Sequence, residues 1–356
     1  METLTLGLAQ HTDPARVQFH FVLDSDSGYF PREALADAGA ELVVVPPYQH
    51  PIAHRRALVE QFSQLRLDIV HAHTTTLVPF SLSAAERAGV PVRIAHAHTM
   101  AGTGEWGKNL MKYSLRPFAK RWATDLATSS LYAGDWLFGK DTTQHREVFY
   151  LPVARDLSAF EYDAVVRTRM RQELDLEDRF VVGHLGRFVA QKNHLFLLDC
   201  FKEVHAREPS AVLVLAGEGE LHDEVERAAA RLGVDGAVRF LGHRSDAPAL
   251  YQAFDVFVLP SLYEGVPGTG VEAQAAGLPF VYSDTVTAEA LLLPTARRLP
   301  LSAGPGAWAE QVLSYRQGSR TEDAIAQLDA KGFGIVGAAE RLSEYYEGLV
   351  RRNGAG

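Results

Sequence analysis

The sequence predicts an α/β protein with two doubly wound domains, each built on a parallel sheet covered by helices. Short apolar runs alternate with helix-length amphipathic segments along the chain, which is typical of parallel sheets. The length of 356 residues is long for one hydrophobic core and comfortable for two. A hydrophobic content of 47% and a charged content of 22% are ordinary values for a globular protein.

The apolar runs form two series, and each series predicts one sheet with ligands at the carboxyl ends of its strands. The runs lie at residues 17–23, 41–46, 67–73, 92–98, 124–130 and 147–152, and then at 180–186, 211–217, 237–242, 255–260 and 278–283. The domain boundary is expected near 151–160. We therefore expect a first domain at 1–155, a second at 156–335, and a terminal helix at 336–356 that packs back on the first domain.

Composition and charge limit the function classes. The net charge is −9, and nothing in the sequence points to nucleic acid as a partner. No apolar run is long enough to span a bilayer, and the start METLTLGLAQ lacks the pattern of a secretory signal. The single cysteine, Cys200, stands in an apolar helical run, so we expect it to pack in a core. These features predict a cytoplasmic protein.

Residues 257–279, FVLPSLYEGVPGTGVEAQAAGLP, are the most informative part of the chain. After a strand-like run, Glu264 and Glu272 stand eight positions apart around a glycine-rich loop. Glycines such as Gly268 and Gly270 let a backbone approach a ligand closely. A helix that begins near Gly270 would direct unpaired N–H groups at the loop, where a phosphate is favoured. Carboxylates accept hydrogen bonds from sugar hydroxyls. The alternative is an ordinary turn with two surface glutamates.

The stretch at 181–193, VVGHLGRFVAQKN, adds two cations after another strand-like run. Arg187 offers a rigid fork of donors and Lys192 a mobile point charge, a pair that suits a leaving diphosphate. Taken alone, the two residues would be read as a solvated loop pair.

Together these segments resemble the donor site of family-4 retaining glycosyltransferases of the GT-B fold. The resemblance rests on the E-x7-E pair, on SDTVTAE at 283–289 and on the G-R-x4-K pattern, and it extends over most of the chain. The nearest group is the bacterial capsular and exopolysaccharide transferases. The resemblance implies two Rossmann-like domains with parallel sheets that face each other across a cleft. It also implies transfer of a sugar, with retention, from a UDP- or GDP-type donor to a hydroxyl acceptor, expected to be a lipid-linked glycan. No metal or other cofactor is implied.

The resemblance also implies roles for individual residues. Arg187 and Lys192 would stabilise the departing diphosphate, Glu264 and the following backbone would hold the donor sugar, and Glu272 would bind ribose hydroxyls. The expected catalytic residues are His98, Arg187, Lys192 and Glu264. The expected donor-binding residues are Gly186, Gly217, His243, Gly265, Val266, Pro267, Gly268 and Glu272. Arg244, next to His243, is a further candidate by position near the nucleotide base.

The first half carries two H-x-H pairs, His71 with His73 and His96 with His98. Each pair follows a strand-like run, and a spacing of two places both side chains on one face. A metal site could use such pairs, although carboxylate or cysteine ligands are missing. The resemblance instead places His71 and His73 on the acceptor side and His98 near the transferred sugar, with His96 as the neighbouring alternative. Packing alone is the expected role of one histidine of each pair, His71 and His96.

The segment at 107–121, GKNLMKYSLRPFAKR, holds five positive charges and no acidic residue. The cations are Lys108, Lys112, Arg116, Lys120 and Arg121, and the apolar residues Leu110, Met111, Leu115, Phe118 and Trp122 interleave with them. This pattern suits contact with an anionic membrane, so we expect peripheral association with the inner face of the cell membrane. The alternative is a solvated helix bent by Pro117.

Three features depart from the family pattern or are discounted. Asp24 and Asp26 match the metal-binding D-x-D of GT-A enzymes, but they follow a strand-like run as a turn far from the donor motif, so a solvated loop is expected. Val153 and Ala154 replace the usual Asn and Gly between the domains. The chain also opens inside the family's first helix, so a preceding strand and glycine loop are expected upstream of Met1, and without them the first sheet would keep a gap or an unpaired edge.

Two other function classes remain open at this point. One is a catalytically impaired homologue that binds a nucleotide sugar or a partner enzyme. The other is a GT-B sugar-nucleotide epimerase, or a metal hydrolase that uses the H-x-H pairs. The E-x7-E context favours the transferase.

Overall fold

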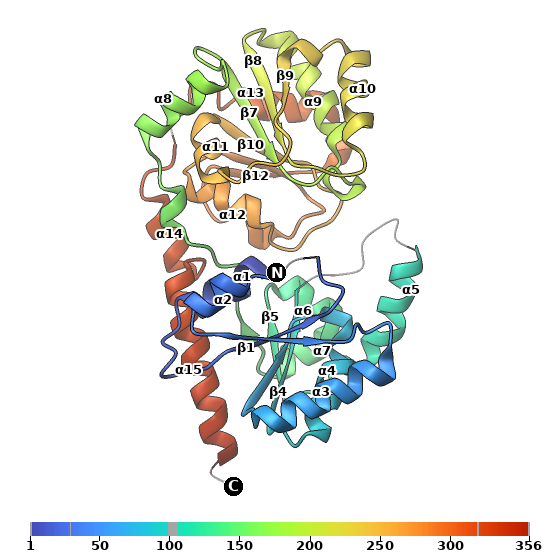
Figure 1. The fold of residues 1–356 in the computed structure, drawn as a ribbon. Coiled ribbons are helices and arrows are strands. Elements are labelled where there is room, and N and C mark those ends of the chain that lie inside the picture. Colours follow the sequence, from blue (N-terminus) through green and yellow to red (C-terminus); the bar gives the residue numbers. More distant parts are fainter. Residues whose placement is uncertain (1, 29, 99–105, 319, 355–356) are drawn as a thin grey trace. The chain divides into compact units, whose positions relative to one another are not determined.

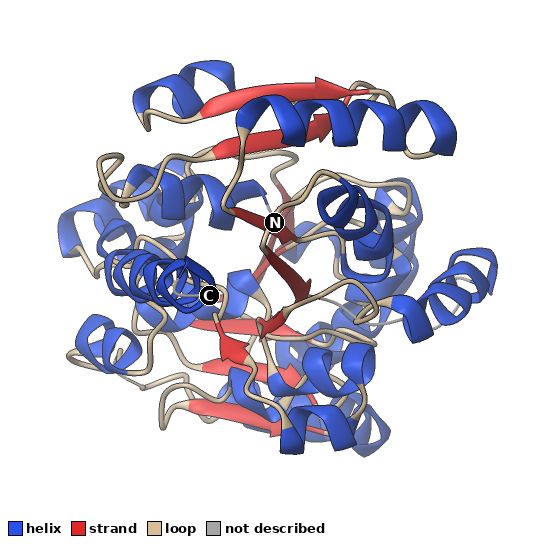
Figure 2. Cartoon of the chain, turned by 90° about the horizontal axis from the view of Figure 1, so that it is seen from below, coloured by secondary structure: helices blue, strands red, loops and turns tan. Residues whose placement is uncertain are grey.

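The computed structural model describes residues 2–28, 30–98, 106–318 and 320–354 (Figure 1). The chain divides into two compact units. Unit 1 comprises Met1–Ala154 and Gly334–Gly356, and unit 2 comprises Arg155–Phe333. Both are α/β with parallel strands, as the alternation of apolar runs predicts. Figure 2 shows the helices, in blue, flanking the strands, in red.

In the part of unit 2 that the structure describes, one parallel sheet has six strands in the order β12-β11-β10-β7-β8-β9. The strands are β7 (Phe180–Leu185), β8 (Ala211–Ala216), β9 (Val238–Phe240), β10 (Val256–Leu259), β11 (Phe280–Ser283) and β12 (Ala296–Leu299). The sequence predicted the first five and missed β12. This strand lies at the sheet edge and places Arg297 and Arg298 in solvent, so it shows no apolar run.

Helices cover both faces of this sheet. They are α8 (Ala164–Glu173), α9 (His194–Arg207), α10 (His222–Leu232), α11 (Ala247–Ala253), α12 (Gly268–Ala275), α13 (Gly304–Leu313) and α14 (Ala324–Ala330). Val181 of β7 packs in the core that α11, α12 and α14 share, while Val182 packs in the core of α9, α10 and α13. Cys200 packs in this second core as expected, and burial raises the pKa of its thiol.

The described residues of unit 1 form two parallel sheets. The strands are β1 (His20–Asp24), β2 (Glu41–Val45), β3 (Ile69–Ala72), β4 (Val92–Ala97), β5 (Asp125–Thr128) and β6 (Phe149–Tyr150). Strand β1 pairs with β2 alone among the described residues, and β3 to β6 form the other sheet in chain order. The presence of a further strand upstream of Met1 stays a prediction.

The helices of unit 1 are α1 (Glu2–Gln10), α2 (Arg32–Asp37), α3 (Pro51–Leu65), α4 (Val78–Arg87), α5 (Trp106–Leu115), α6 (Leu131–Phe138), α7 (Lys140–His145) and α15 (Ile335–Gly354). The terminal helix α15 packs with α1 against β4, with Leu342 and Ile94 in one buried cluster. None of the helices in the described ranges combines the length and the apolar character needed to cross a bilayer.

Candidate active site

The loops that follow β7 and β10 lie at the carboxyl edge of the unit 2 sheet. The two strands are neighbours, although the chain passes through β8 and β9 on one side before it returns on the other. Doubly wound sheets bind ligands at such a reversal of strand order. The β7 loop carries Gly186, Arg187 and Lys192, and the β10 loop carries Glu264. The fold of unit 2 therefore brings together the Arg187–Lys192 loop and the Glu264 loop, which are far apart in the sequence.

Lys192 and Glu264 are in direct contact. Lys192 Nζ donates to Glu264 Oε1 at 2.6 Å, and Ser261 Oγ donates to the same oxygen at 2.6 Å. The two ionised side chains are only 15% and 10% exposed, so water screens their attraction less than that of a surface pair. A bound anion could compete with Glu264 for the lysine.

The loop that carries Lys192 is braced by the β10 loop. Gln191 Nε2 donates to the Tyr263 carbonyl at 2.9 Å, and Asn193 Nδ2 donates to the Pro260 carbonyl at 3.2 Å. Asn193 adopts a left-handed conformation with φ 57° where helix α9 begins. These bonds fix the position of the lysine backbone relative to the glutamate loop.

Arg187 is exposed, and no described residue forms an ion pair with it. Its neighbour Gly186 is packed tightly under the turn after β8. A Cβ atom on Gly217, at φ +143°, would lie 2.1 Å from the Gly186 carbonyl oxygen. Gly217 is therefore required by the approach of two backbones, a reason independent of any ligand. That packing holds the backbone of Arg187 at the sheet edge.

Helix α12 begins at Gly268, two residues before the expected start. The first N–H groups of the helix, on Gly268 and Thr269, donate to no described acceptor. Thr269 Oγ1 is also buried without a partner. The β10 loop thus ends in a helix terminus with unpaired donors, which is a favourable place for an anion or for sugar oxygens.

Glu272 is held by two residues that the sequence interpretation missed. Arg155 Nε donates to Glu272 Oε1 at 2.9 Å, and the Tyr251 hydroxyl lies 3.0 Å from Oε2. Burial, and then the charge of Glu272, raise the pKa of Tyr251 well above its usual value, so the phenol remains a donor. Arg155 directly follows Val153 and Ala154, and this departure from the family pattern was the sequence signal that could have identified Arg155. Tyr251 stands in an apolar helix, and the sequence held no signal for its contact with Glu272.

The glycines of α12 serve packing as well. A Cβ on Gly270 would lie 2.8 Å from the Phe280 ring of β11, so this glycine lets the helix pack on the sheet. A Cβ on Gly268 would lie 2.2 Å from Arg155 Nη2. Gly270 thus has a packing role, its predicted close approach to a ligand stays a prediction, and Gly268 admits the Arg155 guanidinium.

The remaining predicted donor residues differ in their surroundings. Val266 belongs to the hydrophobic core and Pro267 is buried, so the β10 loop offers a ligand their backbone atoms, with Gly265 half-buried beside them. His243, after β9, is exposed. Its neighbour Arg244 pairs with Asp246 at 2.6 Å and with Glu173 at 3.1 Å, which favours a structural role for this arginine.

Two buried histidines, His184 and His194, lie near the β7 loop. The sequence analysis did not use them. His184 Nδ1 contacts the Val258 carbonyl at 2.8 Å and therefore carries the proton, which leaves Nε2 as an acceptor. A Cβ on Gly186 would lie 3.1 Å from that Nε2, so the ring supports the loop from below. Burial, followed by the charge of His194, lowers the pKa of His184 well below its usual value. The ring is neutral at pH 7.

In unit 1, the four predicted histidines come together at the carboxyl ends of β3 and β4. His73 Nδ1 lies 2.8 Å from His98 Nε2, and His71 Nε2 lies 3.0 Å from His96 Nδ1. Burial is the main cause that lowers the pKa of all four rings, to about 4 for His73. Asp24 and Asp26 lie elsewhere in unit 1 and accept hydrogen bonds from the Tyr48 N–H and from Gln49.

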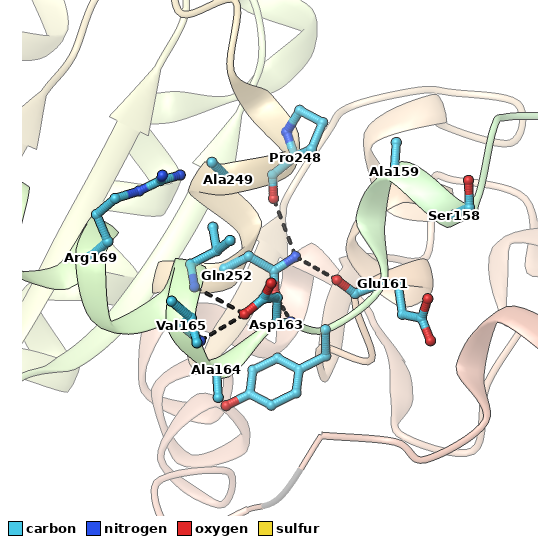
Figure 3. A pocket seen from close by; sticks show the side chains of 12 residues that line it. Ser158, Ala159, Glu161, Asp163, Ala164, Val165, Arg169, Pro248, Ala249 and Gln252 are labelled. Carbon is cyan, nitrogen blue, oxygen red and sulfur yellow. Dashed lines mark hydrogen bonds between the residues drawn. The ribbon is translucent and has the colours of Figure 1, made fainter.

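One surface cavity of unit 2, of about 620 Å³, includes none of the predicted donor residues in its lining (Figure 3). Some of its polar groups bond to one another. Asp163 caps α8 by accepting from Val165 N and Val166 N, and Gln252 Nε2 donates to the carbonyls of Glu161 and Pro248. These bonds fix the loop before α8 against α11 and give the hollow a structural role.

The basic segment at 107–121 is partly described. The side chains of Lys108 and Met111 lie outside the described residues. Leu110, Tyr113 and Phe118 are 74%, 54% and 47% exposed, so apolar side chains do interleave with the charges. Some charges are engaged internally, since Arg116 lies over the Trp136 ring at 5.5 Å and Lys120 donates to Thr142 and to the Phe138 carbonyl.

Comparisons with known proteins agree with the geometry of both units. Residues 179–315 match the family described as "Glycosyl transferases group 1", and residues 1–138 match the "Glycosyl transferase 4-like domain". The chain is 34% identical over 349 residues to glycosyltransferase EpsF of Bacillus subtilis (strain 168), covering 95% of this chain and 91% of the relative. It is 29% identical over 235 residues to an Escherichia coli enzyme named UDP-Gal:alpha-D-GlcNAc-diphosphoundecaprenol alpha-1,3-galactosyltransferase, covering 64% and 60%.

Solved structures share the fold at low sequence identity. HepE from Anabaena, solved with UDP and glucose, superposes with a TM-score of 0.80 at 20% identity, over 97% of this chain and 95% of its own. Sucrose-phosphate synthase from Thermosynechococcus elongatus superposes with a TM-score of 0.70 at 16% identity, over 98% and 92%. Given these structures and the match with EpsF along nearly its whole length, the chain belongs to the group 1 glycosyltransferases and has the GT-B fold.

Proposed function

We propose that this glycosyltransferase moves a hexose from a nucleoside diphosphate sugar to a hydroxyl acceptor, with retention of configuration and without a metal ion on the diphosphate. The observation that carries the proposal is the placement of Arg187, Lys192 and the start of α12 at the switch point of the unit 2 sheet. Two cations and a helix terminus can neutralise a diphosphate without a divalent ion.

The residues have separate tasks in this proposal. Arg187 and Lys192 stabilise the negative charge that grows on the diphosphate as the bond to the sugar breaks. Lys192 exchanges its bond to Glu264 for the diphosphate, and Glu264, which Ser261 still orients, accepts from a sugar hydroxyl. Exclusion of water from the site limits hydrolysis of the donor.

The nucleoside side of the donor is assigned to Glu272 and the loop after β9. Glu272 accepts from ribose hydroxyls, while Arg155 and Tyr251 fix its orientation. His243 lies by position near the base. In unit 1, His98 positions the donor sugar and His73, its hydrogen-bond partner, lies on the acceptor side with His71.

We further propose a lipid-linked glycan as acceptor, in the synthesis of a capsule, exopolysaccharide or other surface polysaccharide. Support comes from relatives, whose names include a transferase acting on a diphosphoundecaprenol-linked sugar and a Vi polysaccharide biosynthesis protein. A cytoplasmic enzyme that binds the inner membrane face through residues 107–121 would meet such an acceptor. The exposed Leu110, Tyr113 and Phe118 support this arrangement.

The donor proposal is tested by a screen of UDP-, GDP- and ADP-sugars for thermal stabilisation and slow donor hydrolysis, with and without EDTA. One donor class should stabilise the protein, EDTA should change neither readout, and Arg187→Ala should lose the stabilisation. Arg231→Ala removes an exposed arginine of α10 and serves as the matched control. Stabilisation that survives in Arg187→Ala would refute the diphosphate assignment. Donor binding without hydrolysis or transfer would favour a catalytically impaired homologue, which the divided sheet of unit 1 also supports.

Membrane contact is tested by co-sedimentation with vesicles that contain anionic lipid. We expect binding at low salt that weakens as ionic strength rises, because screening reduces the attraction between Lys or Arg and the lipid headgroups. Replacing Leu110 and Phe118 together by Ser should weaken binding at every salt concentration. The exposed Ile52 on α3 provides a control in the same unit as Ile52→Ser. Absence of binding at low salt would remove the membrane proposal.

A further inference from the structure

Four histidine rings form a compact block on one face of the β3–β6 sheet. His71 belongs to β3 and His96 to β4, and His73 and His98 stand just beyond the ends of these strands. His71 pairs in register with Ile94, which places His73 level with His96 on the same face. The rings of His71 and His73 stack at 4.2 Å between centroids, and those of His96 and His98 at 3.8 Å.

Two pairs of ring nitrogens in this block are in direct contact. His71 contacts His96 at 3.0 Å and His73 contacts His98 at 2.8 Å. Each contact requires one protonated and one bare nitrogen. The second nitrogen of His96, Nε2, is buried without a partner, and the whole residue is 0% exposed. A buried polar atom without a partner is costly, so the block carries a donor or acceptor that packing alone does not explain.

We propose that His71, His73 and His96 bind a divalent transition-metal ion, with Zn²⁺ as the representative ion. One ring nitrogen of each residue lies within 4.8 Å of those of the other two. Neutral imidazoles are preferred ligands of Zn²⁺, Cu²⁺ and Ni²⁺, whereas Mg²⁺ and Ca²⁺ require oxygen ligands that this group lacks.

Tyr346 supports this assignment from outside the ligand group. Its hydroxyl, on α15, lies 2.7 Å from His71 Nδ1. An imidazole that binds a metal through one nitrogen usually donates its other N–H to an oxygen, which fixes the orientation of the ring. His71 Nε2 is then directed into the block. The site therefore joins β3, β4 and α15 within unit 1.

The experiment uses the full chain without an affinity tag, stripped of metal with a chelator. Zn²⁺ affinity is measured by competition with a chromogenic chelator, and Co²⁺ absorption spectra report nitrogen coordination. We expect one equivalent per chain, at least about 100-fold weaker binding in His71→Gln and His96→Gln, and about 10-fold weaker binding in Tyr346→Phe. Bound Zn²⁺ should raise the thermal midpoint of the wild type and leave that of His71→Gln unchanged.

The matched control is His222→Gln in unit 2. His222, Asp223 and Glu226 form the second described group with metal-compatible spacing, on the surface of α10. Stoichiometric binding that His222→Gln abolishes, or that survives in His71→Gln, would overturn the proposal, and so would the absence of stoichiometric binding. If His96→Gln fails to fold, the metal affinities of His71→Gln, at a partly exposed position, and of the conservative Tyr346→Phe decide whether the site exists. Circular dichroism checks that these variants fold.

Discussion

At the scale of single residues, the electrostatics of unit 2 depend on ionisable groups that are held away from water. Lys192 and Glu264 form an ion pair in which both side chains are largely buried. Removal of either would leave the other charge buried and uncompensated, which is strongly unfavourable. His184 and His194 are buried nearby without a carboxylate partner and remain neutral. The loop after β7 is thus supported by neutral rings and carries its positive charge on the ligand side.

His194 makes the stability of unit 2 sensitive to acid. Burial, followed by the charges of Lys192 and His222, lowers the pKa of His194 from 6.5 to about 4. Between these values the unfolded chain binds a proton that the folded chain excludes, so stability falls as the pH decreases from about 6.5 to about 4 and levels off below. The loss attributable to this ring is about 3 kcal/mol.

The measurement is the free energy of unfolding as a function of pH for the wild type and for His194→Leu. Both ring nitrogens of His194 are buried without a partner, so the apolar side chain removes the titration without breaking a hydrogen bond. We expect a shallower acid limb in His194→Leu and an unchanged limb in His243→Gln, which alters an exposed histidine of the same unit. Parallel curves for all three proteins would contradict the assignment.

At the scale of elements, the turns after β7 and β8 are hydrogen-bonded to each other. Phe188 N donates to the Glu218 carbonyl at 2.9 Å, and Gly186 N donates to the Ala216 carbonyl at 3.0 Å. Gly217 and Gly219 allow this contact because neither carries a Cβ. The position of Arg187 therefore depends on a turn 30 residues further along the chain, which a local motif does not reveal.

Gly217→Ala should separate these turns. The new methyl group would meet the Gly186 carbonyl oxygen at 2.1 Å, and φ +143° is unfavourable for alanine. We expect a loss of stability of about 2 kcal/mol or more and weaker donor binding, because the Gly186–Arg187 backbone is displaced. Thermal melts and donor titrations measure the two effects. Gly236→Ala adds a methyl group in open space and should stay within about 0.5 kcal/mol of the wild type; equal effects of both changes would refute the argument.

At the scale of the whole molecule, each unit has its own hydrophobic cores. The clusters around Phe257 and Leu213 belong to unit 2, and those around Leu82 and Ile94 belong to unit 1. Units with separate cores can unfold in separate transitions. The residues proposed to bind the nucleotide all lie in unit 2. The histidines proposed to contact the sugar and the acceptor lie in unit 1.

A nucleoside diphosphate should therefore stabilise unit 2 selectively. At 100 times its dissociation constant, the correct nucleotide should add about 2.7 kcal/mol to the stability of the unit that binds it. Calorimetry combined with hydrogen exchange on peptides from β7, β10 and α12 would assign the shifted transition. Equal protection of β1 to β6, or protection that persists in Arg187→Ala, would argue against a nucleotide site confined to unit 2.

The sequence by itself determined the α/β class and five of the six described strands of unit 2, and it located the two segments proposed to bind the donor, because strand periodicity, turn glycines and charged motifs are local signals. Tertiary structure decided which residues meet. The contact of Lys192 with Glu264, the support of Glu272 by Arg155 and Tyr251, and the block of four histidines all depend on strand order and register. The edge strand β12 escaped prediction because its exposed arginines carry no apolar pattern. Motifs made of neighbouring residues can be recognised in the sequence, whereas contacts between distant side chains depend on how the sheets and helices pack.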